Sequence, residues 1–434
     1  MTGVVTRHRI CLLRKGPSVQ PFDYRGGELY CENVPVAAIA RKIGTPFYLY
    51  SQSALAQQFR AFDDAFASLP HLTCYAVKAN SNLAILSLFR ILGAGFDVVS
   101  KGELMRAIAA GADPKKIVFS GVGKTENEID LGLRRGILQF NVESAAEFGM
   151  LEARARALGK VCNIALRVNP DVDAGTHPYI ATGSRRHKFG ISAGDTLEIC
   201  RRARRSRHVR VTGIACHIGS QITSMEPFLK ALRQLREIFL NLRAQGVDVR
   251  HMDLGGGLGI EYNDEKPPCP GEYARAVLSA LRGVDCTLIL EPGRVIVGNA
   301  GILVTSVVLT KRTGEKNFIV VDAGMSDLLR PSLYGSYHGI QAVARHRRGR
   351  CKADVVGPIC ESGDFLARDR EMPIVKAKEL LAIMSAGAYG FVLSSNYNTR
   401  ARPAEVLVRG RRVKTIRKRE RFEDLIRGES ARPM

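Results

Sequence analysis

Residues 74–80 (CYAVKAN) form a short apolar segment that runs up to a lysine, Lys78, and then turns polar. A lysine at this place is most simply explained as a solvated residue at the start of a loop. The alternative is a reactive amine held at the end of a buried strand. The residues that end the other strands decide between the two.

Seven further apolar segments follow, and helical patterns separate them. Helical spacing is clearest over 82–95, 100–112, 144–160 and 225–246, most of which close on a glycine. Eight strand-and-helix units in about 250 residues are typical of a (β/α)8 TIM-type barrel, whose active site forms where the strands end. The eight expected strands are 72–77, 96–99, 117–120, 138–142, 163–168, 211–217, 250–254 and 287–290.

Reactive residue types recur at the ends of these expected strands. A chain without a site there would end its strands in ordinary turn residues. The end residues, in chain order, are Lys78, Ser120, Asn141, Glu143, Arg167, Asn169, His217, the run GGGLG at 255–259, Glu291 and Arg294.

The sequence after Arg294 changes to strand-rich segments with glycine and charged turns, such as GILVTSVVLTKRTG and KNFIVVDAG. The segment GGELYCENVPV, near the start of the chain, also has strand character. We therefore predict an α/β plus β protein. Its barrel domain spans 47–294, and a second, β-rich, barrel- or sandwich-like domain is built from 1–46 plus 295–434.

Composition bounds the function class. The 434 residues are 45% hydrophobic and 24% charged, as in ordinary globular proteins. The most apolar stretch, 380–393, is too short and too interrupted by glycine to span a membrane. Residues 1–20 are basic but lack the apolar core of a secretion signal, and ten cysteines occur without CxxC pairs. These features predict a cytoplasmic protein with reduced thiols and no metal site.

The net charge of +22 is concentrated in three arginine-rich runs, at 201–208, 345–352 and 409–422. Such runs can bind nucleic acid. They lack interleaved aromatic residues and any known reading motif, so a solvated basic surface is the better interpretation.

A lysine nucleophile, a glycine-rich turn and a buried acid are together what pyridoxal phosphate (PLP) chemistry requires. In a low-dielectric barrel mouth we expect a depressed pKa for Lys78, so that a neutral amine can attack an aldehyde. The turn at 255–259 suits a phosphate, and Glu291 suits a pyridine nitrogen. The alternatives are an ordinary tight turn, a Glu291–Arg294 ion pair, and a structural histidine at His217.

Seven motifs, in this order, resemble the fold-type III PLP-dependent decarboxylases, and within them the diaminopimelate decarboxylases. They are YAVKAN, FDVVSKGEL, HIGSQ, DLGGGLGI, EPGR, GPICESGD and AGAYGF, and the resemblance covers about 22–406. It implies that Lys78 forms a Schiff base with PLP, that His217 stacks on the ring and that Glu291 contacts its nitrogen. The other implied cofactor-binding residues are Ser220, Gly255, Gly256, Gly257, Gly293, Arg294 and Tyr389.

The same resemblance implies the substrate-binding residues Arg294, Arg330, Tyr334, Glu361 and Tyr389. Cys360 and Glu361 match a pair that a neighbouring subunit delivers, the thiol as proton donor and the carboxylate as partner of the distal amino group. The implied reaction converts meso-diaminopimelate to L-lysine, and the implied assembly is a homodimer with shared active sites.

Three alternatives remain open at this point. Ornithine and arginine decarboxylases share the fold, but ornithine-type sites resemble CDGLD where this chain has CESGD. Their substrates also lack a second carboxylate for Arg294 and Arg330 to bind. The third alternative is a non-catalytic regulatory homologue, which would have little need of Lys78, Glu291 and Cys360 together.

Overall fold

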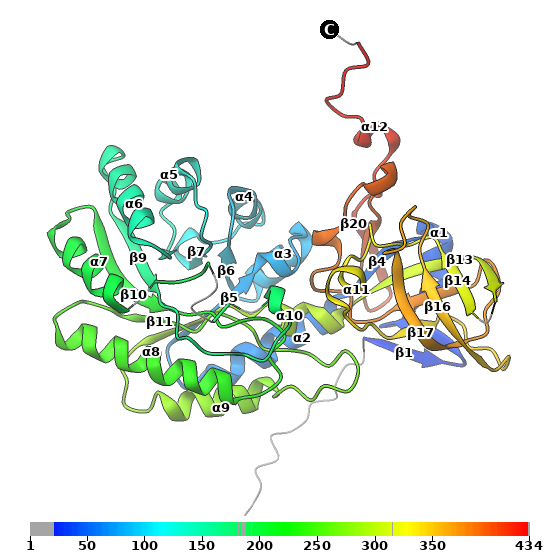
Figure 1. Ribbon diagram of the computed structural model, residues 1–434, viewed down its shortest axis with the longest axis horizontal. Coiled ribbons are helices and arrows are strands. Elements are labelled where there is room, and N and C mark those ends of the chain that lie inside the picture. Colours follow the sequence, from blue (N-terminus) through cyan, green and yellow to red (C-terminus); the bar gives the residue numbers. More distant parts are fainter. Residues whose placement is uncertain (1–20, 181, 184–187, 192, 315, 433–434) are drawn as a thin grey trace, which may run out of the picture.

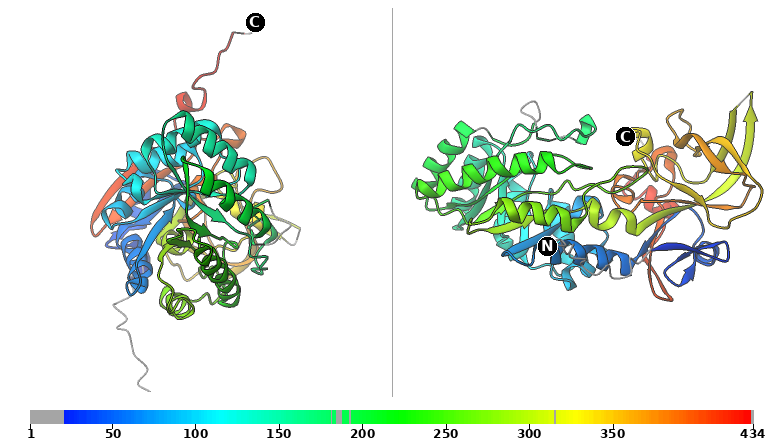
Figure 2. Two further views of the ribbon diagram at one scale, coloured as in Figure 1. Left: turned by 90° about the vertical axis from the view of Figure 1, so that its left-hand side faces the viewer. Right: turned by 90° about the horizontal axis from the view of Figure 1, so that it is seen from below.

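The computed structural model describes residues 21–180, 182–183, 188–191, 193–314 and 316–432. The basic segment 1–20 therefore lies outside the described residues. The barrel and the β-rich part lie side by side, with the end of the chain extending from the β-rich part (Figure 1 and Figure 2).

Eight parallel strands close into a barrel in the order β10-β11-β12-β5-β6-β7-β8-β9. This confirms the predicted TIM-type barrel, and each strand overlaps its expected segment. The strands are β5 (His71–Ala76), β6 (Gly95–Val98), β7 (Ile117–Phe119), β8 (Gln139–Val142), β9 (Cys162–Arg167), β10 (Val209–Ala215), β11 (His251–Asp253) and β12 (Thr287–Leu290).

Helices surround the barrel, and polar residues fix where several of them begin (Figure 1). Ser100 Oγ accepts the amide of Glu103 at 3.2 Å and Ser144 Oγ that of Glu147 at 3.1 Å, which satisfies amides left unpaired in a first helical turn. The helices are α2 (Gln52–Asp63), α3 (Leu83–Ile91), α4 (Lys101–Ala109), α5 (Glu126–Arg135), α6 (Ala145–Ala157), α7 (Ala193–Arg205), α8 (Glu226–Ala244), α9 (Pro270–Ala280) and α10 (Arg294–Val297).

The second part is the predicted β-rich domain. Its main sheet follows the path β17-β16-β14-β13-β4-β19-β20, with β18 pairing with β13 and β15 with β18. The long strand β13 connects the barrel to this sheet. The strands are β4 (Phe47–Ser51), β13 (Gly301–Thr313), β14 (Lys316–Val321), β15 (Ile340–Ala342), β16 (Arg350–Val356), β17 (Phe365–Pro373), β18 (Leu380–Ile383), β19 (Ala404–Arg409) and β20 (Arg412–Arg417).

Three short strands and three helices complete this part of the chain. A small antiparallel sheet joins β1 (Phe22–Arg25), β2 (Glu28–Cys31) and β3 (Val34–Pro35). The helices are α1 (Val36–Ile43), α11 (Arg330–Tyr334) and α12 (Phe422–Leu425). Side chains of α1 and β2 join a buried apolar cluster with those of β4 and β19, so the first segment of the chain packs into the second domain.

Strand β4 lies in the sheet of the β-rich domain, although the expected range 47–294 assigned it to the barrel. It pairs antiparallel with β13 and parallel with β19. All five of its residues are buried, as in a barrel strand. The burial pattern of β4 therefore fits either domain, and its pairing with β13 and β19 assigns the strand to the β-rich domain.

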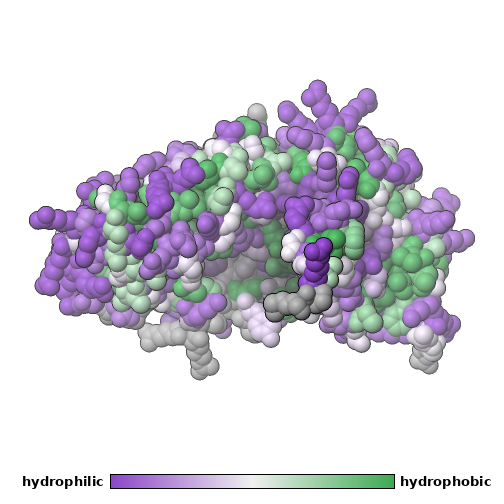
Figure 3. Space-filling view, turned by 90° about the horizontal axis from the view of Figure 1, so that it is seen from above, coloured by the Kyte–Doolittle hydropathy of each residue, from purple (hydrophilic) through white to green (hydrophobic). Residues whose placement is uncertain are grey.

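The surface matches the composition. Hydrophilic side chains cover much of the face shown in Figure 3, and that face is hollowed where the barrel meets the second domain. Among the described residues, no helix is both long enough and apolar enough to cross a membrane. The nine cysteines within the described part of the chain are free thiols.

Candidate active site

Lys78 lies in a tight turn (Val77–Ala79) directly after strand β5. Tyr75 donates its hydroxyl to the carbonyl of Asn80 at 3.0 Å, and the amide of Tyr389, from the second domain, donates to the carbonyl of Ala79 at 2.8 Å. The turn is thus held from both domains. The lysine side chain is 32% exposed and faces a cavity at the carboxyl end of the barrel.

Lys78 forms an ion pair with Asp97 of β6, with 2.5 Å between Nζ and Oδ2. Burial alone lowers the pKa of Lys78, but the charges of Asp97, Glu291 and Tyr389 and the hydrogen bond to Asp97 outweigh burial and raise it. The expected depressed pKa is therefore wrong for this chain. Burial is predictable from the sequence, whereas the acids that face Lys78 from neighbouring strands, Asp97 and Glu291, reverse its effect.

Glu291 follows strand β12 and is 6% exposed. Its Oε1 accepts hydrogen bonds from Ser120 Oγ at 3.3 Å and Asn141 Nδ2 at 3.2 Å. Burial, followed by the charges of Asp253 and Asp97, raises the pKa of Glu291 well above its usual range. Burial also raises the pKa of Asp253, to about 6. Both buried carboxyl groups therefore hold their protons to a higher pH than a solvated carboxyl group does.

The alternative of a Glu291–Arg294 ion pair does not occur among the described residues. Arg294 begins helix α10 and is 4% exposed. Its Nη1 donates to Tyr262 at 2.7 Å and its Nη2 to Ser220 at 2.9 Å. Its Nε is buried without a partner in the described part of the chain, so the guanidinium keeps a donor that a bound anion can use.

His217 lines the cavity after strand β10. The amide of Gly256 donates to its Nδ1 at 3.2 Å, and burial, with the charges of Lys78 and Arg167, lowers its pKa well below the usual value. The ring is therefore neutral, with its hydrogen on Nε2. A flat, uncharged ring of this kind is suited to stacking on a heterocycle.

The glycine turn after β11 brings backbone segments unusually close together. Gly255 has φ +62°, and a Cβ on it would lie 2.6 Å from the carbonyl oxygen of Cys216. A Cβ on Gly256 would lie 2.2 Å from that of Glu291. Glycine is therefore required at both positions. With Gly257 and Gly293, these glycines expose backbone amides, and together with the hydroxyl of Ser220 they are suited to a phosphate.

The cavity measures about 380 Å³ and joins residues from the ends of seven of the eight barrel strands. This volume is in the range of small-molecule sites. Lys78, Asn141, Arg167, His217 and Glu291 line it, together with Ser120 and Phe189. The structure thus brings together Lys78, His217 and Glu291, the three residues predicted to hold the ring of the cofactor.

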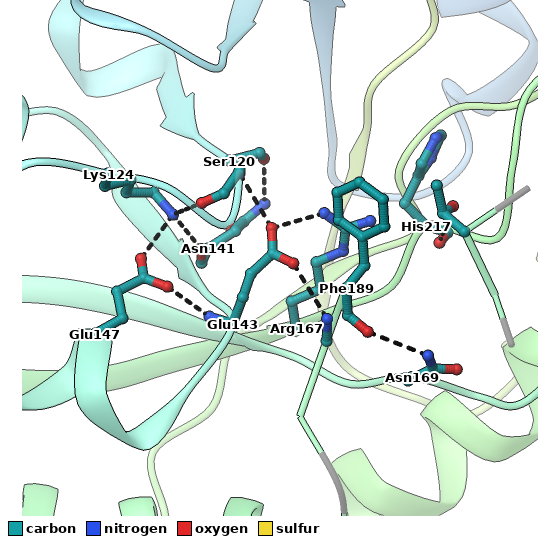
Figure 4. A network of polar contacts seen from close by, with 12 residues as sticks. Ser120, Lys124, Asn141, Glu143, Glu147, Arg167, Asn169, Phe189 and His217 are labelled. Atoms are coloured by element: carbon teal, nitrogen blue, oxygen red, sulfur yellow. Dashed lines mark hydrogen bonds and ion pairs between the residues drawn. The ribbon is translucent and has the colours of Figure 1, made fainter. Parts of the chain in front are cut away.

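A buried polar network holds one side of this cavity (Figure 4). Glu143 Oε1 accepts from Arg167 at 2.8 Å and from the amide of Gly121 at 3.1 Å, and its Oε2 accepts from the amide of Gly190 at 3.1 Å. Glu143 thus links the segments that follow β7, β8 and β9. A second buried pair, Lys124 with Glu147, lies behind it at 2.7 Å.

Two arginines meet beside the cavity at Tyr262. The guanidinium carbon of Arg330 lies 5.0 Å from the centre of the Tyr262 ring, and that of Arg294 lies 5.8 Å from it. Arg294 also lies 4.7 Å from the ring of Tyr389, and Arg330 lies 5.8 Å from that of Tyr334. The structure therefore groups four predicted site residues, and their two cations could bind a carboxylate.

Cys360 and Glu361 lie elsewhere. Both are exposed, and neither lines the cavity that contains Lys78. The amide of Cys360 donates to Asn398 Oδ1 at 2.8 Å, which fixes the backbone of this segment. Within one chain, the structure does not bring this pair to the other predicted residues.

Four further polar residues of the site were not predicted: Asp97, Asp253, Tyr262 and His338. Asp97 and Asp253 stand inside the motifs FDVVS and DLGGG, so a search for acids at strand ends could have found them. Tyr262 lies in a loop, and no sequence signal marks it. His338 lies 3.3 Å from Arg330, and its pKa is lowered to about 3 by burial and by the charge of Arg330, so it is neutral.

The comparisons with known proteins agree with this geometry. Residues 52–298 match the pyridoxal binding domain of the pyridoxal-dependent decarboxylases. Diaminopimelate decarboxylase of Pseudomonas aeruginosa is 52% identical, covering 95% of this chain and 99% of that protein.

Two solved structures are similar over almost the whole chain. Helicobacter pylori diaminopimelate decarboxylase in complex with L-lysine is 42% identical with a TM-score of 0.88, covering 90% of this chain and 98% of that one. The M. jannaschii enzyme with L-lysine is 36% identical with a TM-score of 0.91, covering 95% and 98%. The chain therefore belongs to the pyridoxal-dependent decarboxylases and, within them, to the diaminopimelate decarboxylase family.

Proposed function

We infer that this protein is a PLP-dependent carboxy-lyase that converts meso-diaminopimelate to L-lysine and carbon dioxide, the last step of lysine biosynthesis. The observation that carries the inference is similarity to diaminopimelate decarboxylases along nearly the full chain. The site supports it, because a lysine, a neutral histidine and a buried acid line one cavity beside a glycine cradle.

The residues present fit PLP. The glycine cradle, Ser220 and the unpaired Nε of Arg294 suit its phosphate, and Glu291 suits its ring nitrogen. When bound, PLP supplies an electron sink that stabilises negative charge left on the substrate Cα. The cofactor-binding residues of this proposal are Lys78, His217, Ser220, Gly255, Gly256, Gly257, Glu291, Gly293, Arg294 and Tyr389.

Four residues have proposed catalytic roles. Lys78 would hold the cofactor through its amine. His217 packs against the ring, and Glu291 keeps a proton at the ring nitrogen through a charge-assisted hydrogen bond. Cys360 donates a proton to the Cα that has lost its carboxylate.

The substrate has an amino acid group at each end, so its distal end needs both a cation and an anion. Arg294 and Arg330, which meet at Tyr262, would bind the distal carboxylate, with Tyr334 and Tyr389 lining that end. Glu361 would bind the distal ammonium group. Ornithine and arginine lack the second carboxylate and would leave two buried cations without a partner.

We also propose a homodimer in which Cys360 and Glu361 complete the site of the neighbouring subunit. Their exposure on the single chain supports this arrangement, because both roles require contact with substrate. We further propose that the protein works in the cytoplasm, which its free thiols support.

Lysine release from the PLP-loaded protein tests the function, with meso-diaminopimelate, ornithine and arginine supplied in separate assays. We expect lysine from diaminopimelate and no turnover of the other two. Turnover of ornithine or arginine would contradict the roles of Arg294 and Arg330. Absence of any turnover by a protein that binds PLP at Lys78 would favour a regulatory homologue.

A further inference from the structure

Strands β8 and β11 place polar side chains at two levels inside the barrel. Gln139 and Asn141 alternate with apolar residues on β8, and His251 and Asp253 do so on β11. Gln139 is fully buried, and Asn141 and Asp253 are 2% and 1% exposed. Interiors of such barrels are usually filled by branched apolar side chains. Buried amides across two levels therefore need an explanation.

The hydrogen bonds between these residues all run in one direction. His251 Nδ1 lies 3.0 Å from Gln139 Oε1, Gln139 Nε2 donates to Asn141 Oδ1 at 3.0 Å, and Asn141 Nδ2 donates to Glu291 Oε1 at 3.2 Å. Because Gln139 presents its oxygen to the ring, His251 Nδ1 must carry the hydrogen. We call His251, Gln139 and Asn141 the amide column.

The upper end of the column meets both buried carboxyl groups. Asn141 Nδ2 also lies 3.1 Å from Asp253 Oδ2 and 3.0 Å from Ser120 Oγ, and Figure 4 shows Asn141 beside Ser120. Asp253 Oδ1 accepts the amide of Gly255 at 2.8 Å. If the Asn141 amide were reversed, its oxygen would face two carboxyl groups, so Gln139 and His251 hold the only favourable orientation.

The lower end of the column lies at the opposite end of the barrel. His251 is half-buried and lines a second cavity, of about 440 Å³, with Thr212 and Arg250. The column thus spans the interior from that cavity to Glu291. In such a series of hydrogen bonds, each bond polarises the next.

We propose that the amide column positions Glu291 and favours its ionised form, so that the ring nitrogen of PLP rather than Glu291 would carry the proton between them. This inference rests on the proposed function and extends it to Asn141, Gln139 and His251 as positioning residues. Burial and the charge of Asp253 favour a protonated Glu291. The hydrogen bond that Asn141 donates to Glu291 favours the charged carboxylate, so it opposes the effects of burial and of Asp253.

The test replaces Asn141 by leucine, which keeps the volume and removes the donor. Asn163→Leu is the matched control, because Asn163 lies on the neighbouring strand β9 and, within the described residues, its side chain donates a single 3.4 Å bond, to the carbonyl of Leu138. Each protein is loaded with PLP that is isotope-labelled at the ring nitrogen, and the nitrogen resonance is recorded at neutral pH. Affinity is compared between PLP and an analogue with carbon in place of that nitrogen.

We expect a protonated ring nitrogen in the unaltered protein and in Asn163→Leu. In Asn141→Leu the resonance should move toward the unprotonated value. The preference for PLP over the carbon analogue should fall about tenfold, since a hydrogen bond to a charged group is lost. His251→Phe, at the half-buried lower end, should shift the resonance in the same sense by a smaller amount.

An unchanged resonance and an unchanged preference in Asn141→Leu would overturn the proposal. If that variant does not fold, His251→Phe decides, and an unshifted resonance there overturns it. Lysine release by the unaltered protein is measured in parallel. Failure of the proposed function would appear in that assay, whereas failure of the amide column alone would leave turnover intact and the resonances of all variants equal.

Discussion

The charge on Lys78 depends on one neighbour. Asp97 is fully buried and pairs with Lys78 through Oδ2. Its other oxygen, Oδ1, has no hydrogen-bond partner among the described residues. An amine must be neutral to attack an aldehyde. The ion pair with Asp97 favours the protonated amine, so it opposes that attack in the cofactor-free protein. The acid that most raises the pKa of the lysine is therefore a residue for which the sequence suggested no role.

Asp97→Asn should lower the pKa of Lys78 in the cofactor-free protein. Burial would then act without the opposing charge of Asp97, and the shift should be about one pH unit or more. The measurement is the rate at which the cofactor-free protein captures pyridoxal, followed by absorbance across a pH series. The midpoint should move to lower pH in Asp97→Asn and stay in place in Asp248→Asn, which alters an exposed acid. Equal midpoints in all three proteins would show that Asp97 does not set the charge.

The carboxyl groups of Asp253 and Glu291 should make the stability of the cofactor-free protein fall as pH rises. Their folded pKa values are raised, that of Asp253 from 3.8 to about 6, so the folded state binds more protons than the unfolded state between these values. Stability is therefore lost from about pH 4 upward, by roughly 1–3 kcal/mol up to pH 7. Urea unfolding across this range measures it.

The comparison for that experiment is Asp253→Asn, whose free energy of unfolding should vary less with pH over the same range. Asn also loses one acceptor for Asn141 or Gly255, so the slope against pH is the informative quantity and the absolute stability is not. A slope equal to that of the unaltered protein would contradict the raised pKa of Asp253.

At the scale of elements, Glu143 connects three strand ends that are separate in the sequence. One buried carboxylate accepts from the segments after β7 and β9 and from the guanidinium of Arg167. The Arg167 side chain is 8% exposed, and it also stacks on Phe189, with 4.8 Å from its guanidinium carbon to the ring centre. Glu143 therefore fixes one wall of the cavity, through Gly121 and Arg167.

Glu143→Ala should destabilise the protein by about 3–5 kcal/mol, because it leaves the charge of Arg167 buried without a partner. Glu143→Gln should cost less, since the amide oxygen can still accept from Arg167. Denaturant unfolding of the PLP-loaded proteins measures both. Asp248→Ala, which breaks an exposed pair with Arg250, is the control and should leave the midpoint unchanged. A loss in Glu143→Ala no larger than in that control would show that the pair does not stabilise the fold.

The sequence predicts the barrel strands well because each is a short apolar run with a distinctive end. Alternation of strands and helices then gives the barrel, and strand ends of a barrel meet at one face, which predicts the grouping of Lys78, His217 and Glu291. Strand β4 shows the limit. It is apolar and buried like a barrel strand, but its partners β13 and β19 are far away in the sequence.

The same limit explains why the sequence did not predict some residues of the site. Whether Asp97 meets Lys78 depends on the register of the neighbouring strands β5 and β6, and whether Gln139 meets His251 depends on distances across the barrel interior. A linear pattern gives the side of the strand on which a residue lies, but it does not identify the residue opposite. The raised pKa of Lys78 was missed for this reason, since burial can be predicted from the sequence and a cross-strand ion pair cannot.

For the molecule as a whole, the single chain gathers a cavity, a cofactor cradle and two cations, but it leaves Cys360 and Glu361 on the surface. Tyr397 lies beside this pair, and the neighbouring carboxylate of Glu361 raises its pKa. In the proposed function both groups contact substrate, and their position outside the cavity is explained if each subunit completes the site of another. A homodimer is the simplest closed assembly of this kind.

Complementation between two inactive variants tests this assembly. Lys78→Ala cannot hold the cofactor covalently, and Cys360→Ala lacks the proposed proton donor, so each should have little activity alone. After mixing, unfolding and refolding, half of the dimers are mixed, and each mixed dimer holds one site with both native residues. Recovery should therefore approach about a quarter of the unaltered activity, as random pairing of a two-fold dimer requires. Refolding each variant alone is the control. Activity that does not exceed the sum of the two controls, in a preparation that sediments as dimers, would show that Lys78 and Cys360 act within one chain or that Cys360 is not needed.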